Sequence, residues 1–185
     1  MSKLLYSKPL KHTTNVGKAI ELQLSYQLFG EPIGTAPVVM VNHALTGNSL
    51  VTGKNGWWQD LIGDKKPIDT NKYTIIAFNI PGNGFDDVLI DNYQDFVAKD
   101  IASLFLKGLE QIGIKQLFAI IGGSLGGGIA WEMSAIKNDI AIHLIPIASD
   151  WKSTDWLIAN CRIQEQFLLN SSKPVHDARM HAMMC

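Results

Sequence analysis

The chain has 185 residues, 46% of them hydrophobic and 18% charged, which is ordinary for one globular domain. Its formal net charge of −1 gives no reason to expect nucleic acid or an anionic membrane as a partner. No apolar run approaches the roughly 18 residues that span a bilayer, and the N-terminal segment lacks the apolar core of a signal peptide. The two cysteines, Cys161 and Cys185, indicate no disulfide framework, so we expect a cytoplasmic protein.

Apolar periodicity predicts strands and helices that alternate along the chain. Alternating apolar residues predict an early half-buried antiparallel strand, and short apolar runs predict four more strands. Near-helical apolar spacing predicts three helices, in addition to the one that follows the glycine-rich motif described below. The strands are expected at residues 20–28, 38–41, 73–79, 117–121 and 140–148, and the helices at 92–112, at 154–169 and from 174 onward. This order is typical of a mainly parallel α/β sheet flanked by helices.

The sequence after residue 148 carries no strand pattern. We therefore interpret residues 1–185 as a single α/β domain whose C-terminal strands are missing. A parallel sheet without its outer strands has an apolar edge, so we expect low solubility or association with another chain that covers the edge. A homodimer is among the expected assemblies.

The most informative motif lies between Lys115 and Ala135. A short apolar run is followed by Gly122-Gly123-Ser124-Leu125-Gly126, and a helical pattern continues from there. This is the pattern of a G-x-S-x-G nucleophile elbow between a strand and a helix. Glycine is required at both ends of the motif because a Cβ would crowd the sharp turn. We expect Ser124 to be a catalytic nucleophile; an idle serine in a Gly-rich turn is the alternative.

An acyl-transfer serine also needs an oxyanion hole, in which N–H groups stabilise the developing negative charge. In a fold with this elbow, one donor is the N–H after the nucleophile, here Leu125, and the other comes from a loop after an earlier strand. The loop His43–Gly47 lies in that place, and the Leu45 N–H is our candidate. A plain turn at the strand end is the alternative. His43 is expected to be structural, because it precedes the serine and the catalytic histidine of this fold comes last.

The remaining members of a Ser-Asp-His triad allow two interpretations. In a compact hydrolase, Asp150 and either His176 or His181 would serve Ser124. The catalytic histidine should follow a final strand, however, and the sequence after residue 154 is predicted to be helical. The catalytic Asp and His are therefore expected beyond Cys185. No metal site is predicted, because the spacing of the last two histidines does not place both imidazoles on one helix face.

Several further segments occur in a distinctive order with the elbow. They are the oxyanion loop at 42–47, the segment 56–63 with Trp57-Trp58, residues 68–70, the elbow with Gly127, the helix at 154–169, and residues 178–183. Together they resemble the homoserine O-acetyltransferase family of α/β-hydrolase-fold enzymes. The resemblance covers most of residues 20–185, and the Trp-Trp segment carries most of its specificity.

The resemblance implies acetyl transfer from acetyl-CoA to the hydroxyl of homoserine, in methionine biosynthesis. Ser124 would be acylated first in a ping-pong scheme, with acetyl-CoA as a substrate and no bound cofactor. Family members are longer than this chain, and their Asp, His and substrate-binding arginine come from the C-terminal half. We therefore expect the 185-residue chain to be inactive alone. A serine esterase of the same fold and a catalytically silent binding module are the alternatives.

Overall fold

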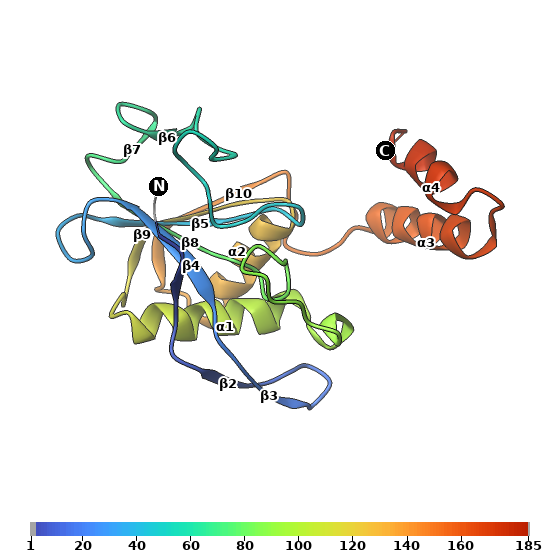
Figure 1. Ribbon diagram of the computed structural model, residues 1–185, viewed down its shortest axis with the longest axis horizontal. Coiled ribbons are helices and arrows are strands. Elements are labelled where there is room, and N and C mark those ends of the chain that lie inside the picture. The colour runs from blue at the N-terminus through green and yellow to red at the C-terminus, as the bar shows by residue number, and fades with distance from the viewer. Residues whose placement is uncertain (1–2, 185) are drawn as a thin grey trace. The chain divides into compact units, whose positions relative to one another are not determined.

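A six-stranded sheet organises the first unit of the computed structural model, which describes residues 3–184 (Figure 1). Contacts divide the chain into two units, one ending at Ser149 and one beginning at Asp150. The sheet order is β1-β4-β8-β5-β9-β10, in which the last four strands are parallel and β4 runs antiparallel to both of its neighbours, β1 and β8. The strands are β1 Leu5–Tyr6, β4 Ser25–Gly30, β8 Thr74–Phe78, β5 Val38–Asn42, β9 Leu117–Gly123 and β10 Ala141–Ile147. The predicted mainly parallel α/β architecture is confirmed.

Both faces of the sheet are covered, which is why its central strands are continuously apolar. Every residue of β5 and of β8 is buried, as expected for parallel strands between two layers. Figure 1 shows α1 and α2 on one side of the sheet and the β6–β7 segment on the other. These elements are α1 Ala98–Gln111, α2 Leu125–Ile136, β6 Ile62–Gly63 and β7 Ile68–Asp69.

Each face has its own hydrophobic core. On the helical face, Phe78 of β8 stacks on Phe105 of α1 with ring centroids 5.1 Å apart. On the other face, Trp57 and Trp58 pack against buried residues of β5, β8 and β9. Their rings lie 4.5 Å apart, and the Trp57 Nε1 donates to the Asn48 carbonyl at 2.8 Å. The Trp-Trp segment is therefore part of the second core.

The register brings the C-terminal ends of three strands to one level. Asn42 of β5 pairs with Gly122 of β9, and Ile147 of β10 pairs with Gly123. The chain leaves all three strands at the same edge of the sheet. In open α/β sheets, this edge is where ligands bind.

Two predicted elements differ from the observed ones. The single strand expected at 20–28 is two strands: β3 (Ala19–Leu22) pairs with β2 (Leu10–Thr13) in a separate hairpin, and β4 joins the main sheet. Period-two alternation continues through both strands, so it does not mark where the chain changes sheet. The helix expected from 92 begins at Ala98, after a 3-10 turn (η1, Tyr93–Asp95), because the Asp100 carboxylate accepts the Val97 N–H at 3.0 Å and caps the helix there.

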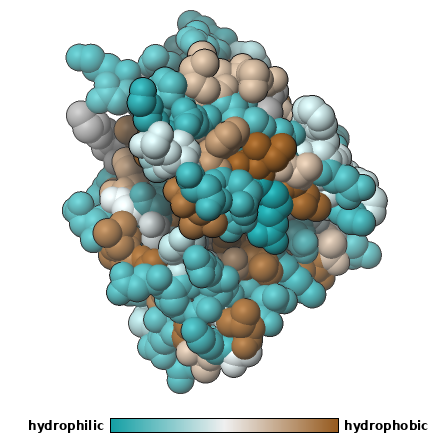
Figure 2. Space-filling view, turned by 90° about the vertical axis from the view of Figure 1, so that its right-hand side faces the viewer, coloured by the Kyte–Doolittle hydropathy of each residue, from teal (hydrophilic) through white to brown (hydrophobic). Residues whose placement is uncertain are grey.

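The second unit is a pair of helices, α3 (Asp155–Asn170) and α4 (Pro174–Ala182). Thr154 caps α3 by accepting the Leu157 N–H at 3.2 Å, and Pro174 occupies the first turn of α4. Between 149 and 184 the structure has these two helices and no strand, as the sequence pattern predicts. The space-filling view shows apolar residues at the surface (Figure 2). On α3, Trp156 is 71% exposed and Leu169 is 70% exposed. No helix within residues 3–184 has the length and apolar character needed to cross a bilayer.

Candidate active site

Ser124 occupies a strained position between β9 and α2. Its backbone has φ 52° and ψ −120°, which is uncommon for a residue with a side chain. Such conformations raise the free energy of the folded state by about 1–3 kcal/mol and persist only where the surroundings enforce them. The side chain is exposed at the edge of the sheet where β5, β9 and β10 end. The backbone therefore has the sharp turn that the G-x-S-x-G pattern predicts.

The glycines on both sides of Ser124 are required by close backbone contacts. A Cβ on Gly122 would lie 2.1 Å from the Gly126 carbonyl oxygen, and a Cβ on Gly126 would lie 2.2 Å from the Asn42 carbonyl oxygen. Neither carbonyl is a flexible side-chain end that could move aside. The first turn of α2 is thus packed directly against the end of β5, which leads into the predicted oxyanion loop.

The two predicted oxyanion donors have no partner among residues 3–184. The Leu125 N–H is at the start of α2, where helix N–H groups lack intrahelical acceptors. The Leu45 N–H lies within a turn that the Gly47 N–H closes by donating to the Ala44 carbonyl at 2.9 Å. By contrast, the Ser124 N–H donates a hydrogen bond to the Ile147 carbonyl at 2.9 Å. Whether the Leu45 and Leu125 N–H groups converge on one oxygen stays a prediction.

The Ser124 hydroxyl makes no hydrogen bond to any side chain in the described part of the chain. His43, the first residue of the predicted oxyanion loop, is 1% exposed, and both of its ring nitrogens have partners. His176 pairs with its neighbour Asp177 at 2.9 Å. The triad of Ser124, Asp150 and His176 or His181 therefore stays a hypothesis.

Two residues beside the elbow, Ala148 and Ser149, were not singled out by sequence reasoning, whereas the Trp57-Trp58 pair could be interpreted from the sequence as a pocket lining or as core. The Trp58 ring lies 3.8 Å from the place of a Cβ on Gly123, one residue before the nucleophile. The Ser149 side chain lies over Gly127, because a Cβ on Gly127 would be 2.5 Å from the Ser149 Cβ. Ala148, the residue before Ser149, has φ 49°. The Trp57-Trp58 pair is the sequence signal for the contact between the Trp58 ring and Gly123. No sequence signal marks Ser149, because its position depends on the strained residue before it.

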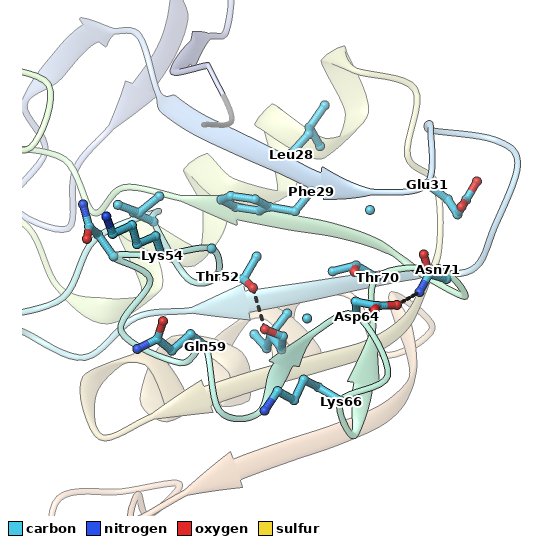
Figure 3. A pocket seen from close by; sticks show the side chains of 16 residues that line it. Leu28, Phe29, Glu31, Thr52, Lys54, Gln59, Asp64, Lys66, Thr70 and Asn71 are labelled. Carbon is cyan, nitrogen blue, oxygen red and sulfur yellow. Dashed lines mark hydrogen bonds between the residues drawn. The ribbon is translucent and has the colours of Figure 1, made fainter.

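A separate cavity lies on the face of the sheet that the β6–β7 segment covers (Figure 3). Its volume is about 940 Å³, and its lining includes Thr52, Lys54, Lys66 and Asn71. The Thr52 hydroxyl donates to the Ile62 carbonyl, and the Asn71 amide donates to Asp64. Ser124 and the two proposed oxyanion donors are not among the lining residues, so this cavity is distinct from the elbow.

The geometry agrees with comparisons to known proteins. Residues 37–157 match the alpha/beta hydrolase fold family, and the chain belongs to that family. Within it, the chain is similar to homoserine O-acetyltransferases. It is 30% identical to the one from Methanococcus vannielii over 91% of this chain and 38% of that protein.

Solved structures give the same fold. The homoserine O-acetyltransferase from Staphylococcus aureus superposes with a TM-score of 0.83 at 26% identity, covering 100% of this chain and 58% of that one. Esterase E22 superposes with a TM-score of 0.79 at 21% identity, covering 94% of this chain and 54% of that one. The chain thus spans less than two thirds of the length of the relatives it matches.

The elbow contacts predict unequal effects of two glycine substitutions. Gly122→Ala is expected to lower the free energy of unfolding by about 1–3 kcal/mol, the range for overpacked sites, because its Cβ would meet a backbone carbonyl. Gly128→Ala is the matched control: its Cβ would have only the Ser149 hydroxyl near it, at 4.0 Å, and alanine favours a helix by about 1 kcal/mol. Denaturant unfolding of both variants measures the difference. Equal stability would contradict the close contact at Gly122.

Proposed function

We propose that Ser124 is the nucleophile of an O-acyltransferase that moves an acetyl group from acetyl-CoA to the hydroxyl of homoserine. The observation that carries this proposal is the strained backbone of Ser124 between two glycines that have no space for a side chain. Strained backbone of this kind is concentrated at functional sites. The similarity to homoserine O-acetyltransferases supports the donor and the acceptor.

The proposed acetyl transfer has two steps, acylation of Ser124 and transfer of the acetyl group to homoserine. The Ser124 Oγ attacks the thioester carbonyl carbon, the C–S bond breaks, and coenzyme A leaves with the proton that the serine gave up. The homoserine hydroxyl then attacks the acetyl-serine, the bond from the carbonyl carbon to Oγ breaks, and Ser124 recovers a proton. The Leu45 and Leu125 N–H groups stabilise the oxyanion in both steps, and each such donor contributes about 10²–10³ in rate.

A serine esterase is the second candidate, with water in place of homoserine as the acceptor. The fold shared with esterase E22 and the exposure of Ser124 to solvent favour it. A catalytically silent binding module is the third candidate. It is favoured by the Ser124 hydroxyl, which has no hydrogen-bonded base within residues 3–184.

The cellular compartment and the assembly of the protein are part of the same proposal. The Cys161 thiol is exposed and forms no disulfide within residues 3–184, and on this basis we place the protein in a reducing, cytoplasmic compartment. The outer strand β10 exposes Ile142, Ile145 and Ile147, which supports association with another chain, including a second copy of this one.

Acetylation of Ser124 tests its role as nucleophile. The 185-residue chain is incubated with p-nitrophenyl acetate, and the modified serine is located by peptide mass spectrometry. We expect slow acetylation of Ser124, because an oxyanion hole alone retains roughly 10³–10⁴ of catalysis over water. Ser124→Ala should lose this label. Ser103→Ala, which alters a surface serine of α1 bonded to the Lys99 carbonyl, should keep it. Equal labelling of Ser124→Ala and the wild-type protein would contradict the assignment.

The turnover of the 185-residue chain is a separate prediction. With acetyl-CoA and homoserine, we expect no steady release of coenzyme A, because a missing general base costs about 10²–10⁴ in rate. A thiol reagent measures the release with and without homoserine. Release that depends on homoserine would show that a base reaches Ser124 after all, with Asp150 and His176 or His181 as the candidates. Release that is independent of homoserine would favour the esterase.

A further inference from the structure

The oxyanion loop is held by a buried histidine whose two nitrogens have different partners. His43 Nε2 lies 3.0 Å from the backbone nitrogen of Ile80, in the segment after β8. A backbone N–H can only donate, so Nε2 is the acceptor and carries no proton. The proton of the neutral imidazole is then on Nδ1, which donates to the Ala44 carbonyl at 2.7 Å. The partners therefore fix the tautomer of His43.

The bond to Ala44 also determines the direction of the proposed donor. The Ala44 carbonyl and the Leu45 N–H belong to one planar trans peptide unit, in which they point in opposite directions. Holding the carbonyl oxygen therefore aims the N–H away from His43. The same oxygen accepts the Gly47 N–H at 2.9 Å, so two donors fix this peptide.

A network of uncharged groups supports the histidine. The Asn79 amide oxygen accepts the Ser49 N–H at 2.8 Å, and the Asn79 amide nitrogen donates to the Ser25 hydroxyl at 2.9 Å. The Asn83 amide lies within 3.4 Å of both His43 Nε2 and the Gly47 carbonyl oxygen. The network therefore ties both ends of the loop to the segment after β8.

From these contacts we propose that His43 is a positioning residue for the reaction. This inference rests on the proposed function of Ser124. Its neutral imidazole sets the orientation of the Ala44–Leu45 peptide, and protonation of Nε2 breaks the bond to the Ile80 N–H that anchors the ring. His43 does not contact the reacting atoms; it acts through the Leu45 N–H.

The surroundings of His43 make this arrangement sensitive to acid. Burial lowers the pKa of His43, and the hydrogen bond to the Ala44 carbonyl opposes that shift only in part. Asn79, Asn83 and the backbone of Ala44, Gly47 and Ile80 surround it, and no charged group among residues 3–184 contributes to the shift. Because the pKa is lower in the folded state, the unfolded chain takes up the proton first. The stabilisation is complete above the ordinary histidine pKa of about 6.5 and decreases as the pH falls below it.

Nuclear magnetic resonance of the 185-residue protein tests the positioning without any assay of activity. Nitrogen-15 spectra of the imidazole should show the Nδ1–H tautomer of His43. The Leu45 and Ile80 amide signals should move together with the ionisation of His43 as the pH is lowered. An Nε2–H tautomer, or a Leu45 signal that does not follow His43, would overturn the proposal.

Two substitutions separate the bonds that His43 makes. His43→Asn keeps a donor near the place of Nδ1, whereas His43→Gln keeps an acceptor near the place of Nε2. We expect the rate of Ser124 acetylation to fall roughly ten-fold or more in His43→Gln, because an oxyanion donor is misaligned, and to stay closer to wild type in His43→Asn. Equal rates in both variants and the wild-type protein would overturn the proposal.

The control is a half-buried histidine of the same unit. His12 Nε2 lies 2.7 Å from the Asp100 carboxylate, and this pair ties β2 to α1. His12→Gln should lower the stability but leave the acetylation rate unchanged. If the wild-type Ser124 is not acetylated at all, the proposed function fails, and the tautomer and the coupled amide signals still decide the role of His43.

Discussion

The contact between the elbow and the end of β5 is the constraint on which the site depends. The Gly126 backbone is so close to the Asn42 carbonyl that no side chain fits between them. This contact places the start of α2 beside the strand that continues into the oxyanion loop. It also accounts for the backbone of Ser124, since a chain that must leave β9 and enter α2 within one residue has no relaxed conformation available.

The register of the sheet makes that contact possible. Asn42, Gly123 and Ile147 end at one level, so a nucleophile, a donor loop and the segment after β10 meet at one edge. The nucleophile is supplied by a local turn, whereas the donor loop is supplied by a segment about eighty residues earlier in the chain. The His43 network connects this loop to the segment that follows β8, so the ends of four strands contribute to the position of the two proposed donors.

The parts of the site that depend on local geometry could be predicted from the sequence. Glycine on both sides of Ser124, after a buried strand and before a helix, is a local requirement and is visible in the residues themselves. The buried strands β5, β8 and β9 were predicted for the same reason, because parallel strands covered on both faces are continuously apolar.

Features set by distant contacts could not be predicted. The tautomer of His43 depends on the Ile80 N–H, and the place of Ser149 depends on the left-handed backbone of Ala148. The division of residues 20–28 between two sheets depends on pairing partners, which period-two alternation does not encode. For the same reason, the sequence marks Leu45 as a donor by its place after β5 but does not tell which way its N–H points.

The most direct test of the proposed active site is whether the Leu45 and Leu125 N–H groups bind the same oxygen. Ser124 is modified with a phosphonate, whose charged oxygen occupies the place of the oxyanion, and the amide signals are compared before and after modification. We expect the Leu45 and Leu125 amide protons both to shift downfield, whereas the Gly127 amide, already bonded to the Ser124 carbonyl, should shift little. A shift at Leu125 without one at Leu45 would contradict the two-donor site.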